Sequence, residues 1–142
     1  MKNNFFIALT VCLVGAATAG DVYVVPGGAE GGNGTRRRPF TTLSQARDAI
    51  RAARRAGRGE EAWTVRMAAG DYLLSEPFVL LPEDSGSAGA PVVYQGEGAE
   101  TRVMGALRVD GWRDTADGLW SAPIPQLPDG TRAYFESLFV NG

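Results

Sequence analysis

The chain has few of the side chains that enzymes use most often for nucleophilic and metal chemistry. Its 142 residues include no histidine, a single cysteine, Cys12, and a single lysine, Lys2. Cys12 lies in an apolar N-terminal run that we expect to be removed, so the mature chain would have neither Cys nor His. This excludes disulfides, thiol nucleophiles, His-based triads and His-ligated metals from the mature residues. We therefore expect no cofactor and no metal site.

The chain also lacks an excess of charge of one sign. A formal net charge of -2 gives no reason to expect a nucleic-acid partner or binding to an anionic membrane surface. The hydrophobic fraction of 44% and the charged fraction of 21% are ordinary for a globular protein. The length fits one domain or part of one. Nineteen Gly and eight Pro, spread along the chain, indicate many short strands joined by turns.

The N-terminus has the pattern of a secretory signal peptide. Lys2 supplies a positive charge, residues 5–14 are apolar, and Ala17-Thr18-Ala19 is a small-x-small cleavage site. The apolar run is shorter than the roughly 20 residues that span a bilayer. We expect a signal peptide over residues 1–19 and a mature chain, 20–142, that begins at Gly20 and is secreted or periplasmic, without membrane contact. The alternative is a buried N-terminal helix or strand.

An amphipathic helix is predicted after Pro39. Thr42 and Gln45 have the spacing of a capping box, and Gly57 is a helix terminator. Asp48 can pair with Arg51 or Arg55, with Arg51 on the outer face. The helix should lie across the open end of a β core, because its apolar stripe is narrow and small-sided: Leu43, Ala46, Ala49, Ile50 and Ala53.

Strand patterns dominate elsewhere. A first strand is expected at residues 21–25, and alternating or short apolar runs continue after Trp63. Two sets of three strands recur at an offset of about 28 residues, within the roughly 20–50 residue range of repeat architectures. The lack of an Asn-Gly or Asp-Gly turn between long strands favours a solenoid over a sandwich. The expected strands of the two sets begin at Thr64, Tyr72, Phe78, Val92, Arg102 and Ala106.

Several motifs together resemble a known protein group. Val22-Tyr23-Val24, a Gly-rich loop and Pro39-Phe40-Thr41-Thr42-Leu43 occur in the order seen at the start of secreted right-handed parallel β-helix proteins. The segment from Val65 to Tyr72 is similar to their first-coil signature, a strand followed by Gly-x-Tyr. The chain most resembles the fucosidase- and xylanase-type glycoside hydrolases of the pectate-lyase-like superfamily. The resemblance implies an all-β fold, a right-handed parallel β-helix with one N-terminal amphipathic cap helix.

The loop from Gly27 to Gly34 invites a phosphate-binding interpretation, but it lacks the Lys-Ser/Thr ending of a P-loop and no helix begins at it. A surface loop, flexible or ion-bound, is favoured. Asn33-Gly34-Thr35 is either a glycosylation acceptor or a turn. Residues 36–38, three arginines, form either a contact for an acidic sugar or a solvated loop face.

No catalytic residue can be named from the sequence. Glycoside hydrolysis needs two carboxyl groups about 5–10 Å apart. The adjacent pairs Glu60-Glu61 and Glu83-Asp84 fit this poorly, because neighbours on a strand point to opposite faces. The resemblance implies that the catalytic acids lie on later coils. Each tryptophan has two possible roles, to stack on a sugar ring or to pack in a core or cap. The three residues are Trp63, Trp112 and Trp120.

The last residues suggest a strand followed by a hairpin turn, Asn141-Gly142, with no return strand. We therefore expect an N-terminal fragment of a longer protein. The main hypothesis is the first part of a secreted glycoside hydrolase that acts on plant or bacterial polysaccharide or oligosaccharide. The alternatives are a non-catalytic glycan-binding or cell-surface protein and a polysaccharide lyase.

Overall fold

The structure is a computed structural model that describes residues 19–127 and 129–140. The predicted signal peptide, apart from Ala19, and the Asn141-Gly142 turn lie outside the described residues. The elements in chain order are β1 (Ala19–Val24), α1 (Leu43–Ala53), η1 (Arg54–Arg58), β2 (Ala62–Met67), β3 (Gly70–Leu73), η2 (Pro82–Asp84), β4 (Val92–Gly96), β5 (Thr101–Met104), β6 (Arg113–Asp114) and β7 (Trp120–Ser121).

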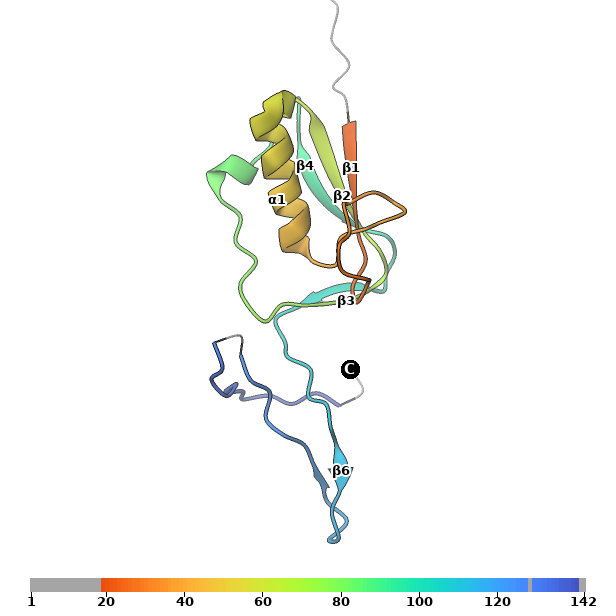
Figure 1. Cartoon of the computed structure of the whole chain (residues 1–142), viewed down its shortest axis with the longest axis vertical. Helices are drawn as coiled ribbons and strands as arrows, with labels where there is room; N and C mark the ends of the chain where they lie inside the picture. The colour runs from red at the N-terminus through yellow and green to blue at the C-terminus, as the bar shows by residue number, and fades with distance from the viewer. Residues whose placement is uncertain (1–18, 128, 141–142) are drawn as a thin grey trace, which may run out of the picture.

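The strands form three short sheets (Figure 1). The first is parallel, in the order β1-β2-β4, with Val65 paired to Val22 on one side and to Tyr94 on the other. The second pairs β3 with β5, also in parallel, and the third pairs β6 with β7 in antiparallel. Residues far apart in sequence therefore meet on neighbouring strands in the first two sheets.

The predicted all-β, right-handed parallel β-helix is wrong. Within the described residues the sheets are short and mixed, and no solenoid sheet forms. The third strand expected in each set is missing at residues 78–81 and 106–109. Pro77 and Pro82 bracket residues 78–81 and remove backbone donors, while Arg47 binds the Val79 carbonyl (2.9 Å). The strand expected near Glu136 is absent as well.

The local prediction of the helix is confirmed. Thr42 caps α1 by accepting from the Gln45 backbone N–H (3.2 Å), and the Gln45 side chain accepts from Thr42 N–H (3.1 Å), which completes the capping box. Beyond Ala53 the chain continues through η1, where Gly57 takes a left-handed conformation (φ 97°) that favours glycine. Both ends of the helical segment thus follow local sequence signals.

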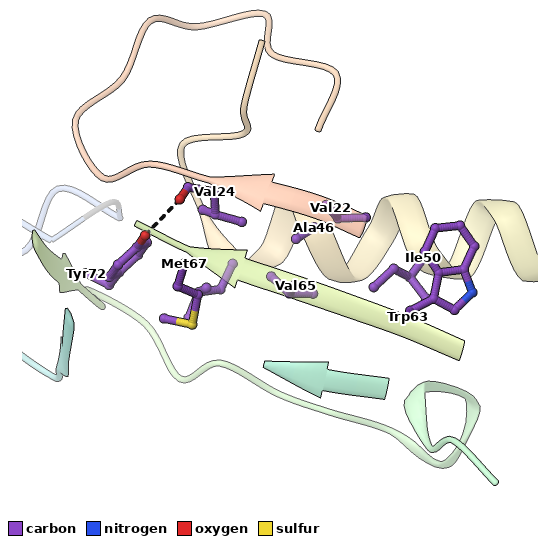
Figure 2. Packing of buried hydrophobic residues seen from close by; sticks show 9 residues of the cluster. Val22, Val24, Ala46, Ile50, Trp63, Val65, Met67 and Tyr72 are labelled. Carbon is purple, nitrogen blue, oxygen red and sulfur yellow. Dashed lines mark hydrogen bonds between the residues drawn. The ribbon is translucent and has the colours of Figure 1, made fainter. Parts of the chain in front are cut away.

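The helix covers a face of the three-stranded sheet and does not close the end of a stack (Figure 1). Leu43, Ala46 and Ile50 are buried, whereas Ala49 and Ala53 are only partly buried. Figure 2 shows Ala46 and Ile50 beside the inward residues of β1 and β2. Burial of such a face supplies about 25 cal/mol per Å² of apolar surface. The sheet contributes Val22, Val24, Trp63, Val65 and Met67 to this core.

Two aromatic residues define the ends of this core. At one end the Tyr72 hydroxyl donates to the Val24 carbonyl (2.9 Å), the dashed contact in Figure 2. At the other end Trp63 is 5% exposed and lies opposite Gly20 on β1, where an added Cβ would meet the indole ring at 2.6 Å. The Arg58 guanidinium lies 4.4 Å from the centre of the Trp63 ring. Trp63 is therefore a core residue.

Ion pairs join the helix to the turn η2. Arg51 donates twice to the Asp84 carboxylate, at 2.6 Å each, and also lies 3.7 Å from Asp48, as predicted. Arg55 pairs with Glu83 (2.9 Å) instead of with Asp48. The expected outward position of Arg51 is wrong, because its side chain is only 16% exposed and is held by a bidentate pair.

The C-terminal residues extend away from this core (Figure 1). The antiparallel pair β6-β7 turns at Asp117 and Gly118, with Gly118 in the left-handed region (φ 71°). Tyr134 and Phe139 are 86% and 81% exposed, so this part has little core of its own. None of the helices in the described part of the chain has the length and hydrophobicity needed to cross a membrane.

Candidate functional site

An open hollow of about 1610 Å³ lies beside β3. It is lined from one side by β3 and the chain after β5, and from the other by the C-terminal residues. Much of its lining is apolar, with carboxylates between the apolar side chains. Its aromatic lining residues are Trp112, Trp120, Tyr134, Phe135 and Phe139. Apolar walls with a few polar groups are typical of small-molecule sites.

The structure separates the three tryptophans. Trp112 and Trp120 both line the hollow and are 42% and 66% exposed. The Trp112 indole N–H donates to the Val109 carbonyl (2.9 Å), which fixes one edge of its ring. For Trp63 the core interpretation is confirmed by its burial. The stacking interpretation is therefore open only to Trp112 and Trp120.

Three carboxylates line the hollow: Asp71, Asp110 and Glu136. Asp71, on β3, accepts from Arg102 on β5 (2.7 Å), and this hydrogen bond raises the pKa of the Arg102 guanidinium. Among the described residues, no three His, Cys, Asp or Glu side chains converge closely enough to hold a metal ion.

Most of the acidic residues singled out in the sequence form ion pairs with arginines. Asp84 accepts from both Arg51 nitrogens and from the Leu81 backbone N–H (2.6 Å). The Arg51 guanidinium is the largest cause that lowers the pKa of Asp84, to about 2. Glu61 pairs with Arg58 (2.6 Å), and this hydrogen bond lowers the Glu61 pKa. Glu60 is exposed, and neither pair lines the hollow.

The glycine-rich loop is a tightly built turn. A Cβ at Gly32 would lie 1.9 Å from the Pro39 carbonyl oxygen, so only glycine allows this backbone approach. The Arg38 guanidinium donates to the Gly31 carbonyl (2.6 Å), while Arg36 and Arg37 are exposed. The Thr35 hydroxyl donates to Asn33 Oδ1 (2.8 Å), so a local side-chain hydrogen bond closes the turn at residues 33–35.

A second, smaller pocket of about 290 Å³ adjoins the hollow. Three residues line both: Asp71, Leu73 and Arg108. Thr41 and Thr42, just before α1, line the smaller pocket alone. Sequence reasoning passed over Asp71 and Arg108 as functional candidates. In the sequence, Gly70-Asp71-Tyr72 is a signal of fold only, and Arg108 falls in an expected strand that does not form.

This arrangement suits the binding of a ligand with both apolar faces and hydroxyl groups. Exposed indole rings can stack on the apolar face of a sugar ring. Carboxylates accept hydrogen bonds from hydroxyl groups, and guanidinium groups donate them. A carboxylate, Asp71, and a guanidinium group, Arg108, line both the hollow and the pocket.

Comparison with known proteins gives one informative similarity. A solved structure described as a glycoside hydrolase aligns with 87% of this chain at 34% sequence identity, with a TM-score of 0.73. The chain spans 21% of the length of that protein. No protein-family model and no curated protein matches the chain. The chain is thus similar, in sequence and in fold, to one part of a glycoside hydrolase.

Proposed function

We propose that this chain belongs to a carbohydrate-active protein and contacts glycans through the hollow beside Trp112 and Trp120. The supporting observation is the 34% identity, over 87% of the chain, to a protein named as a glycoside hydrolase. The exposed indoles and neighbouring carboxylates of the hollow provide suitable chemistry. The substrates are plant or bacterial polysaccharides or their oligosaccharides.

We further propose that the whole protein hydrolyses glycosidic bonds. Hydrolysis requires a pair of opposed carboxyl groups. Asp71, Asp110 and Glu136 are the carboxylates that line the hollow. Asp71 already accepts a hydrogen bond from Arg102, an arrangement that suits a binding contact. The second candidate, a glycan-binding protein without catalysis, is favoured by the same contact.

Binding is tested by electrophoresis of the purified chain through gels that contain xylan, mannan or polygalacturonate. We expect at least one polysaccharide to retard the chain. Trp112→Ala and Trp120→Ala should weaken this retardation roughly 2- to 10-fold through loss of aromatic stacking. Leu119→Ala is the matched control, because Leu119 is as exposed as Trp120 (66% each) and does not line the hollow. Unretarded migration in every gel would contradict the proposal.

The same polysaccharides distinguish the reaction classes. New reducing ends without ultraviolet absorbance indicate a hydrolase, and reducing ends with an unsaturated, absorbing product indicate a lyase. Retardation without either product indicates a binding protein. We expect hydrolysis from the whole protein.

Export is the remaining part of the proposal. The run at residues 5–14 and the Ala17-Thr18-Ala19 site support cleavage before Gly20 and a secreted or periplasmic location. N-terminal sequencing of exported protein should find Gly20 first. Exported material that retains Met1 would contradict this.

A further inference from the structure

The smaller pocket combines apolar surface with several hydrogen-bonding side chains. It is bounded by Pro26 and Gly27 after β1, by Thr41 and Thr42 before α1, by Asp71, Tyr72 and Leu73 on β3, and by Arg108. Its volume of about 290 Å³ is near the lower end of the range for small-molecule sites, roughly 300–1,000 Å³. It can therefore hold one small ring.

The two threonines present complementary groups. Thr42 Oγ1 accepts from Gln45 N–H, so its own hydroxyl proton is left to donate. The Thr41 hydroxyl donates to Gln45 Oε1 (3.1 Å), so its lone pairs are left to accept. The fixed capping box of α1 thus determines which threonine can donate to a ligand and which can accept from it.

The charged residues add a further acceptor and a further donor. Asp71 bonds Arg102 through Oδ1, and no hydrogen bond to its Oδ2 occurs among the described residues. Arg108 forms no ion pair with any carboxylate in the part of the chain that the structure describes. The nearby Asp71 pairs with Arg102. Tyr72 is buried and donates its hydroxyl proton to the Val24 carbonyl, so it has no proton left to donate to a ligand.

We propose that this pocket is a subsite for a single sugar ring, whose hydroxyl groups bind Thr41, Thr42, Asp71 and Arg108. Sugar hydroxyls both donate and accept, which matches a pocket that offers donors and acceptors together. Asp71 is paired with Arg102, so Arg108 is the charged group of this pocket without an ion-pair partner among the described residues. This subsite rests on the proposed glycan binding and extends it.

The position of the pocket also fixes the path of a longer glycan. Because Asp71, Leu73 and Arg108 line both cavities, a chain with one ring in the pocket continues directly into the hollow. The following rings then lie in the hollow that Trp112 and Trp120 also line. The structure therefore assigns hydroxyl recognition to the pocket and ring stacking to the hollow.

Calorimetric titration of the purified chain with xylo-, manno- and cello-oligosaccharides tests this subsite, with oligogalacturonate as the charged probe. Arg108→Gln and Asp71→Asn should each raise the Kd of the bound neutral oligosaccharide about tenfold, the effect of losing a hydrogen bond to a charged group. The controls are Arg37→Gln and Asp117→Asn, which change exposed residues that line neither cavity. Their Kd should match that of the unaltered chain.

Thermal melts identify any variant that loses folded structure, and Arg108→Gln breaks no ion pair among the described residues. An unchanged Kd for Arg108→Gln, with binding still weakened by Trp112→Ala, would overturn the subsite and leave the proposed glycan binding intact. An absence of binding to every probe would overturn the proposed function itself.

Discussion

At the scale of single residues, charged side chains serve two separate purposes. Arg51 and Asp84 form a bidentate pair in which the Asp84 side chain is only 6% exposed. Arg108 instead borders both cavities and has no carboxylate partner among the described residues. The first pair tethers the turn η2 to α1. Arg108 is available to a ligand.

The Asp84 carboxylate makes stability dependent on acid pH. Its pKa is about 2 in the folded chain, against an ordinary value of 3.8, chiefly because of the hydrogen bond from Arg51. The folded state thus keeps Asp84 ionised where the unfolded chain already binds a proton. Its stabilising contribution is complete above the ordinary value and is lost as the pH falls toward 2.

Asp84→Asn should lower the Tm above pH ~5, because Arg51 loses a charged partner in a partly buried site, at a cost of about 1–3 kcal/mol. The difference in Tm from the unaltered chain should close as the pH is lowered from about 4 to 2. Asp117→Asn, on the exposed β6-β7 turn, should follow the unaltered chain at every pH. A difference for Asp84→Asn that stays constant with pH would contradict this account.

At the scale of elements, the molecule is organised around α1 and the sheet face that it covers. The apolar stripe of α1 packs on the inward residues of β1 and β2, and the two arginines Arg51 and Arg55 bind η2 on another side. Outward positions of the helix, such as Ala52, are exposed. Burial therefore differs sharply between neighbouring helical positions.

This difference gives a direct test of the packing. Ile50→Asp should lower the free energy of unfolding by more than about 3 kcal/mol, because it places an unpaired charge in the core. Ala52→Asp, two residues further along the same helix, should change it by less than about 1 kcal/mol. Chemical denaturation of both variants measures these values. Similar losses for the two variants would show that α1 does not pack through Ile50.

Local signals predicted the elements better than their assembly. Thr42, Gln45 and Gly57 act within a few residues of each other, so the helix and its caps could be predicted. Apolar alternation and short apolar runs predicted the strands β2, β3, β4 and β5, whereas their parallel pairing was implied only by the resemblance. Pro77 and Pro82 were usable local signals against a strand at residues 78–81, whereas the contact from Arg47 to the Val79 carbonyl is long-range and could not be predicted. Asp117-Gly118 is a usable sequence signal for the β6-β7 turn, although these two strands were not among those predicted.

At the scale of the whole molecule, a small packed core adjoins an open and largely apolar hollow. The core is made from β1, β2 and α1, and the hollow lies where the chain after β5 turns back toward β3. The sequence predicted Trp112 and Trp120 as one of two possibilities, core or ligand contact. It could not predict their meeting with Asp71 and Arg108, which lie on segments brought together only by the fold.

The three tryptophans allow the most direct test of glycan binding at the hollow. Their indole N–H groups give separate signals in a nitrogen–proton NMR spectrum, and each can be assigned by substitution with phenylalanine. Titration with a binding oligosaccharide should shift the signals of Trp112 and Trp120, which line the hollow, and leave that of buried Trp63 unchanged. Binding that moves neither the Trp112 nor the Trp120 signal would contradict the account.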